Sequence, residues 1–400
     1  MAKLAIRSAV LVVAACLFGP ASSAAAQSEG PAPARKVGTT ADGAPIYRAE
    51  TVSPVYTIDR IYKSMQGPTA VQTRTLLDDP GDPELLWLLA YEAVVTDPSG
   101  EAAKSPEFMC HSATDTSAAV YHQVFPTRMA LRGNRVFSVD QGTLAQRLPA
   151  GFGIPLMSNQ PLLIATQVLN HNFGGEKFDV RQRVSVDFLR HRELEKPLRP
   201  LIQHGVFGLV LVEGPDGHIG VDPKAVGPPV EHGPGCSMAD DVGDPRGVVI
   251  DRFGRRLSSF WVVEPGRHEF HTRVTEFLDL PYDTTVHYAA AHLHPFAQSI
   301  ELYDLTARRS VMKLSARQRE DGIGLADVDS FSSQEGTPLY RGHEYDLIAV
   351  YDNTSGVAQD AMATLLLYVE IRDLEFVIDG DSPERPWKRV VPAALPAAGS

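Results

Sequence analysis

Short strand-like segments between turn-forming residues are the feature that most limits the fold of this chain. The sequence has 32 Gly and 30 Pro among 400 residues, and long runs with the 3.6-residue period of a helix are hard to find. Apolar and polar residues instead alternate in segments such as 135–139, 183–188 and 299–305, as they do in half-buried strands. This pattern predicts an all-β chain with two antiparallel β-sandwich domains in tandem, each resembling a jelly roll.

The composition excludes several classes of partner. The chain is 44% hydrophobic and 22% charged, with a formal net charge of -12. A negative charge of this size argues against nucleic acid or an anionic membrane surface as the partner. No apolar run is long enough for a membrane-spanning helix. The oligomeric state is not predicted.

The first residues are typical of an export signal. Lys3 and Arg7 precede the apolar run 9–19, and residues 24–26 form an A-x-A cleavage site before Gln27. A second interpretation is a lipoprotein anchored through Cys16, because residues 13–16 have the small-residue pattern of such a site. Both interpretations predict a protein that works outside the cytoplasm, in a periplasm or as a secreted protein.

The remaining domain boundaries follow from changes in composition. We expect a signal peptide over residues 1–26, a disordered lead-in over 27–46 and a first sandwich over 47–213, which closes with a strand near 205–212. A Gly- and Pro-rich connector over 214–247 then leads to a second sandwich over 248–381 and a loose tail over 382–400. The apolar run 85–95 fits a buried helix or a buried strand equally well.

Two histidines in a strand-like segment are the strongest chemical signal. His292 and His294 are two residues apart, so both side chains of an extended strand point to the same face. Met362 precedes the apolar segment 363–369. Two imidazole nitrogens and one thioether sulfur form a soft set of ligands that suits copper, especially Cu(I).

With these residues in this order, the sequence resembles the copper type II, ascorbate-dependent monooxygenase family, which includes peptidylglycine alpha-hydroxylating monooxygenase and dopamine beta-monooxygenase. The family carries a His-x-His strand and, farther on, a Met before an apolar strand that ends in Tyr. Segment 260–266 resembles the entry to the family's second domain, and segments 148–155 and 168–172 resemble its first-domain loop and His-bearing strand. The resemblance covers roughly residues 85–372 as a shared order of short motifs.

The resemblance implies a two-copper hydroxylase. His292, His294 and Met362 would hold the catalytic copper, at which dioxygen reacts. A first-domain copper would store an electron supplied by ascorbate or a similar reductant. The expected function is hydroxylation of a C–H bond in a small organic substrate, and the alternative is an exported copper-binding or interaction protein without monooxygenase activity.

The first-domain site departs from the family pattern. Where the family has two adjacent histidines, this chain has Cys110-His111, while His171 matches the third histidine. Three interpretations stay open: Cys110 is a thiolate ligand, Cys110 forms a disulfide with Cys236, or His122 supplies the missing imidazole. Adjacent residues of a regular strand point to opposite faces, so joint ligation by Cys110 and His111 requires a β-bulge.

The residues that bind a peptide carboxylate in the amidating members of the family are also missing. Ala290 stands two residues before His292, where those members have Arg. Thr364 and Leu366 stand where those members have substrate-binding Asn and Tyr. A peptidylglycine substrate is therefore not expected.

Overall fold

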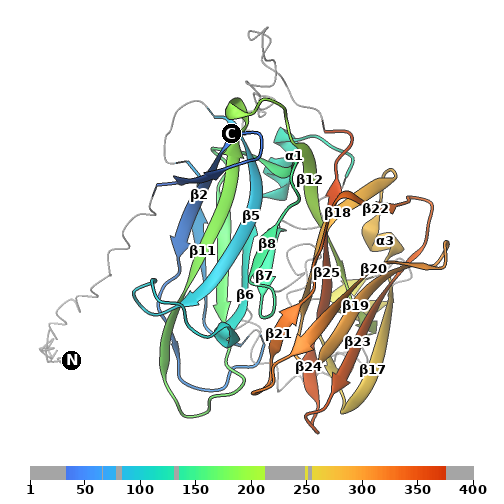
Figure 1. Cartoon of the computed structure of the whole chain (residues 1–400). Helices are drawn as coiled ribbons and strands as arrows, with labels where there is room; N and C mark the ends of the chain where they lie inside the picture. The colour runs from blue at the N-terminus through green and yellow to red at the C-terminus, as the bar shows by residue number, and fades with distance from the viewer. Residues whose placement is uncertain are drawn as a thin grey trace, which may run out of the picture. The chain divides into compact units, whose positions relative to one another are not determined.

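The structure is a computed structural model of the chain and describes residues 33–211, 248–250 and 255–374, apart from residue 65, residues 78–82 and residues 130–134. It is an all-β architecture of stacked antiparallel sheets (Figure 1). The predicted fold class, two antiparallel sandwiches, is therefore confirmed. The predicted signal peptide, the connector 214–247, Cys16, Cys236 and the tail 382–400 lie outside the described residues.

The first sandwich consists of a large sheet with the order β1-β2-β11-β5-β9 and a smaller sheet with the order β4-β10-β6-β7, while β3 pairs with β11 and β8 pairs with β5. The bounds of its strands are β1 (Arg35–Thr39), β2 (Pro45–Val52), β3 (Tyr56–Ile58), β4 (Thr69–Arg74), β5 (Leu85–Thr96), β6 (Met109–Asp115), β7 (Arg135–Asp140), β8 (Ala145–Arg147), β9 (Phe152–Met157), β10 (Leu162–Val168) and β11 (Phe178–Arg190).

The second sandwich places a sheet with the order β12-β25-β18-β22 against a sheet with the order β17-β23-β19-β20-β21. The bounds of its main strands are β12 (Arg199–Phe207), β17 (Gly266–Arg273), β18 (Thr284–Leu293), β19 (Ala297–Asp304), β20 (Arg309–Gln318), β21 (Leu325–Val328), β22 (Phe331–Leu339), β23 (Tyr345–Asn353) and β25 (Ala363–Glu370). Short strands at its margin are β13 (Val210–Leu211), β14 (Val248–Ile250), β15 (Arg256–Ser258), β16 (Trp261–Val263) and β24 (Gln359–Ala361).

Helical segments are short. They are η1 (Pro106–Phe108), α1 (Ala118–Val124), η2 (His191–Glu193) and α3 (Thr275–Leu278). Within the described ranges, no helix is long and apolar enough to cross a membrane.

Strand β12 corrects the expected end of the first sandwich. Its residues 201–207 pair antiparallel with β25, while Arg199 and Pro200 pair in parallel with β9. One continuous sheet of 11 strands therefore runs from β1 through β9 and β12 to β22. The segment that we expected to close the first sandwich is instead an inner strand of the second.

The start of the folded body also differs from the expectation. Residues 35–39 form β1 and residues 45–52 form β2, which pairs with β11. The second part of the predicted lead-in 27–46 is thus part of a sheet, while residues 27–32 are not described. The apolar run 85–95, which fitted a helix or a strand, is β5 and pairs with β11, β9 and β8.

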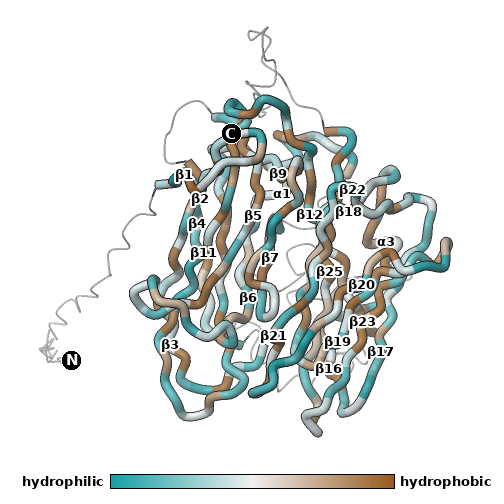
Figure 2. The backbone as a smooth tube through the Cα atoms, in the orientation of Figure 1, coloured by the Kyte–Doolittle hydropathy of each residue, from teal (hydrophilic) through white to brown (hydrophobic). Residues whose placement is uncertain are grey.

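Two hydrophobic clusters hold these sheets together. Figure 2 shows hydrophobic and hydrophilic residues alternating along the strands, as expected for sheets with one face in a core. Ala289, Ala291 and Leu293 of β18 belong to the cluster of the second sandwich, which also takes in buried residues of β5, β9 and β11. Tyr288 and Ala290 point to the other face and join the cluster of the first sandwich. The β12-β25-β18-β22 sheet is therefore covered on both faces.

Candidate metal centre between the two sandwiches

The pairing of β18 with β25 places the residues of the predicted second-domain copper site on one face of the sheet. His292 lies opposite Thr364, as Ala290 lies opposite Leu366, and the backbone N–H of His294 continues the ladder by donating to the carbonyl of Met362 at 3.2 Å. Directly opposite residues share a face of a sheet. This is the face that packs on the first sandwich, so His292, His294 and Met362 lie at the boundary between the two sandwiches.

The two imidazoles are close; the His292 side chain is 12% exposed, and His294 is buried. The ring centroids of His292 and His294 are 5.5 Å apart with an interplanar angle of 79°. His294 is 4% exposed and Met362 is 3% exposed. Met362 belongs to neither large hydrophobic cluster of the described residues.

His292 has one nitrogen fixed and one nitrogen without a partner. Its Nδ1 lies 2.9 Å from Oδ2 of Asp140, which ends β7 of the first sandwich. Its Nε2 is buried, and no described residue forms a hydrogen bond with it. Burial opposes protonation of the ring, but the charge of Asp140 and the hydrogen bond to it raise the pKa of His292. A metal-bound histidine in proteins commonly has this arrangement, with a carboxylate on the nitrogen that does not bind the metal.

His294 also faces a carboxylate. Its Nδ1 lies 3.2 Å from Oδ2 of Asp360, which is on β24 two residues before Met362. Burial acts to raise the pKa of Asp360, but the hydrogen bond and charge of His294, with the charges of His171 and Lys63, lower that pKa to about 2. Asp360 therefore carries a negative charge at neutral pH beside the imidazole.

A β-bulge interrupts β6 at Cys110, the position at which joint ligation by Cys110 and His111 would require one. Gln167 of β10 pairs with His111 and Val168 pairs with Met109, so Cys110 is the extra residue. On the other side of β6, His111 lies opposite Asp140. The charges of both His111 and Cys110 act on the carboxyl of Asp140, whose pKa is raised chiefly by burial. The bulge thus brings Cys110 and His111 near the same carboxylate.

His171 lies in a tight turn after β10. Oδ1 of Asn170 accepts hydrogen bonds from the backbone N–H groups of Asn172 and Phe173, at 3.2 and 2.9 Å. Burial lowers the pKa of His171, and the charges of Asp360, Cys110 and His294 also act on its ring. Its Nε2 is buried without a hydrogen-bond partner among the described residues.

The predicted copper ligands all lie near the boundary between the two sandwiches, but they do not form two complete sets of ligands. They are His292, His294, Met362, Cys110, His111 and His171. In the described part of the chain, no three His, Cys, Asp or Glu side chains surround a point as metal ligands would. A site made of Cys110, His111 and His171 is consequently not assembled. The set of His292, His294 and Met362 contains only two residues of those types, and its donors fit copper in kind.

The other two interpretations of Cys110 both stay predictions. The Cys110–Cys236 disulfide stays a prediction because Cys236 is outside the described residues. Sγ of Cys110 lies 3.9 Å from Oε1 of Gln167. His122 is on α1, whose buried residues Tyr121 and Val124 join the cluster of the second sandwich. Phe108 and Met109, which precede Cys110, belong to the other cluster, so α1 and β6 differ in their packing.

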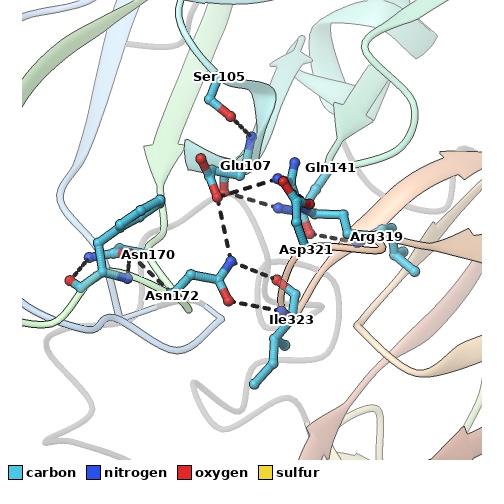
Figure 3. Close-up of polar contacts among 10 residues, drawn as sticks. Ser105, Glu107, Gln141, Asn170, Asn172, Arg319, Asp321 and Ile323 are labelled. Carbon is cyan, nitrogen blue, oxygen red and sulfur yellow. Dashed lines mark hydrogen bonds and ion pairs between the residues drawn. The ribbon is translucent and has the colours of Figure 1, made fainter.

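A polar network beside His171 joins the two sandwiches (Figure 3). The side chain of Asn172 accepts a hydrogen bond from the backbone N–H of Ile323 at 2.8 Å and donates to the carbonyl of Ile323 at 3.1 Å. Oε1 of Gln141 accepts from the backbone N–H of Leu325 at 2.9 Å. Arg319 lies 3.7 Å from Glu107. The loop between β20 and β21 is thereby fixed to the first sandwich.

Sequence reasoning did not find Asp140 or Asp360. Asp140 follows an ordinary alternating strand, and no motif distinguishes it from a surface carboxylate. Asp360 stands two residues before Met362, a spacing that places both on one face of a strand. That spacing is the only local signal that could have identified either residue.

Comparisons with known proteins do not identify a family. No protein-family model matches the chain, and no curated protein matches it.

Solved structures give only weak likenesses. The STIV MCP is 10% identical, and the match covers 80% of this chain and 98% of that chain with a TM-score of 0.28. The major capsid protein P2 from bacteriophage PM2 is 8% identical over 81% of this chain and 100% of that chain, with a TM-score of 0.28. PNGF-II is 7% identical over 84% and 60%, with a TM-score of 0.27. At these TM-scores the likenesses carry no argument about function.

Proposed function

We propose that this chain is an exported copper protein that uses one copper held by His292, His294 and Met362 in a monooxygenase reaction. The single observation that carries the proposal is the state of His292. One ring nitrogen is held by a buried carboxylate at 2.9 Å, and the other is buried without a partner among the described residues. An unpartnered buried nitrogen is costly unless it binds something.

Each of the three residues has a defined part. His292 offers Nε2, because Asp140 occupies Nδ1. His294 lies beside it with its ring nearly perpendicular. Met362, opposite His294 in the ladder, offers a thioether. Thioether ligation favours the reduced metal, Cu(I).

The bound copper would supply the reaction with dioxygen, in which RH, O₂, two electrons and two protons give ROH and water. An ascorbate-like reductant supplies the electrons. The chain itself keeps bulk water away, since His294 and Met362 are almost completely buried. Asp360 lies beside His294 and keeps a negative charge near the site. The substrate is proposed only as a small organic molecule.

A copper-binding protein without turnover is the second candidate, and a specific observation favours it. Cys110, His111 and His171 do not surround a common point in the described structure. The described residues therefore offer no complete set of ligands for a first-domain copper, which stores an electron in the family that this chain resembles. A protein with one copper would bind the metal without the usual source of the second electron.

Copper stoichiometry and oxygen uptake distinguish these candidates. The full mature chain is loaded with Cu(I), desalted and analysed for metal, and oxygen consumption with ascorbate is followed with and without a panel of small organic substrates. We expect one copper per chain, with hydroxylated product for at least one substrate. His292→Ala and Met362→Ala should each lose the metal, whereas His268→Ala, a change at a partly exposed histidine of β17, should keep it.

Two other outcomes are decisive. One copper without product from any substrate supports the binding protein. No retained copper in the wild-type chain, or equal retention in His292→Ala, contradicts both candidates.

A further inference from the structure

We propose that Asp140 is a positioning residue that fixes the ring orientation and tautomer of His292, so that the metal site of the second sandwich is completed by a residue of the first. This inference rests on the proposed copper site. It adds to that site a residue that contacts no metal and lies on a different sheet, at the end of β7.

The geometry of the pair is specific. Asp140 is 2% exposed, and its Oδ2 lies 2.9 Å from Nδ1 of His292. A carboxylate only accepts hydrogen bonds, so the hydrogen of a neutral His292 lies on Nδ1. Nε2 then carries the lone pair, and Nε2 is the buried nitrogen without a partner among the described residues. The carboxylate therefore selects the nitrogen that faces the proposed metal.

A second buried histidine shows the opposite arrangement. Nδ1 of His191 accepts a hydrogen bond from Nε1 of Trp87 at 2.9 Å. Indole nitrogen only donates, so neutral His191 carries its hydrogen on Nε2. Two buried histidines of the same chain are thus held in opposite tautomers by different partners. His191 provides an internal reference for measurements on His292.

The position of Asp140 makes the site dependent on the docking of the two sandwiches. Asp140 lies opposite His111 on β6, and His292 is on β18. Nearby, Asn172 and Gln141 bind the backbone of the loop between β20 and β21. These contacts hold the end of β7 against the second sandwich. A change that separates the sandwiches would remove the acceptor from His292.

The direct test is the ring ¹⁵N spectrum of the metal-free, full mature chain, recorded at a pH at which His292 is neutral. We expect His292 in the Nδ1–H tautomer and His191 in the Nε2–H tautomer. Asp140→Leu removes the acceptor, and Asp140→Asn keeps one oxygen of similar placement. The Nδ1–H population of His292 should fall in Asp140→Leu and fall less in Asp140→Asn.

The same variants are titrated with Cu(I) against a competing chelator. The loss of such a carboxylate typically reduces metal affinity by about 10- to 100-fold, and we expect a reduction of this size in Asp140→Leu with partial rescue in Asp140→Asn. Asp304→Leu is the matched control, because Asp304 is 1% exposed and lies 2.7 Å from Nδ1 of His343 away from the site. It should lower stability and leave copper affinity unchanged.

The outcomes separate this inference from the proposed function. An Nε2–H tautomer of His292 in the wild-type chain overturns the role of Asp140, whatever metal is bound. Unchanged copper affinity in both Asp140 variants also overturns it. If the wild-type chain binds no copper but His292 has the expected tautomer that depends on Asp140, the copper proposal fails and the positioning role stands. If Asp140→Leu does not fold, the wild-type spectrum and Asp140→Asn still decide the question.

Discussion

The backbone N–H of His294 donates to the carbonyl of Met362 at 3.2 Å. Tyr351 donates its hydroxyl to the same carbonyl at 2.6 Å. These bonds fix a residue at the end of β18 beside a residue between β24 and β25. The face of the sheet that carries His292 is thereby extended to include Met362. Met362 therefore lies on the same face as both histidines, as the proposed copper site requires.

The first prediction concerns the thioether. Met362→Leu keeps the volume of the side chain, so the free energy of unfolding should fall by less than about 1.5 kcal/mol. Cu(I) affinity should fall at least about tenfold, because the soft sulfur ligand is lost while both imidazoles remain. Chelator competition measures the affinity, and urea denaturation measures the stability.

Met312→Leu is the control for this prediction. Met312 is 7% exposed and belongs to the cluster inside the second sandwich. It should show a similar change in stability and no change in copper affinity. Equal affinities in the two variants would exclude Met362 as a ligand.

Local patterns in the sequence predicted which residues of one strand share a face. They did not predict which residues of different sheets lie close together. The two-residue spacing of His292 and His294 predicted a shared face, and joint ligation by the adjacent Cys110 and His111 would require a bulge, which β6 contains. Both features depend on the period of a strand alone. The closeness of Asp140 to His292 depends on how two sheets pack. No property of either segment encodes that contact.

The fold, too, was only partly predictable from the sequence. Alternation identified the strands, but it did not show which sheet each strand joins. β12 has the burial of an inner strand and would fit either sandwich, and its partner β25 lies more than a hundred residues farther along the chain. Pairing at this range is set by the complementarity of the sheet faces, which periodicity does not reveal.

The second prediction concerns the contact between Asn172 and the loop at Ile323. Gly322 has a φ of +138°, and a Cβ there would lie 2.6 Å from Oδ1 of Asn172. Gly322→Ala should therefore lower the free energy of unfolding by about 1–3 kcal/mol. A Cβ on Gly342 would meet no heavy atom within 4 Å, so Gly342→Ala should be nearly neutral. Chemical denaturation of both variants checks this difference, and equal stabilities would contradict it.

The third prediction concerns the dependence of stability on pH. Burial would raise the pKa of Asp187, but hydrogen bonds from Arg48 and Arg147, together with their charges, lower it. A carboxyl with a lowered folded-state pKa stabilises the fold above its ordinary value of 3.8, and the stabilisation is lost as the pH falls through the folded-state value. Asp187→Asn should therefore cost about 1–3 kcal/mol at pH 7. Its difference from wild type should shrink below pH 4, as measured by denaturation across pH, and a constant difference would refute this explanation.

The fourth prediction is that the two sandwiches unfold together. β12 pairs with β25 along residues 201–207, while Arg199 pairs with Phe152 of β9, so one strand belongs to a sheet shared by both sandwiches. Tyr368 of β25 also donates to Oε1 of Gln146 in the first sandwich at 2.8 Å. Separating the sandwiches would expose apolar surface and break these bonds. We therefore expect one calorimetric transition with equal calorimetric and van't Hoff enthalpies.

Val206→Ala tests whether β12 is the cause of this coupling. Val206 is 0% exposed and packs in the cluster of the second sandwich. Its truncation should lower the free energy of unfolding by roughly 2 kcal/mol. The whole transition should move to lower temperature and remain a single transition. Two thermal transitions, of which only one moves in Val206→Ala, would contradict this prediction. They would show that β12 stabilises only one sandwich and that the two sandwiches unfold independently despite the shared sheet.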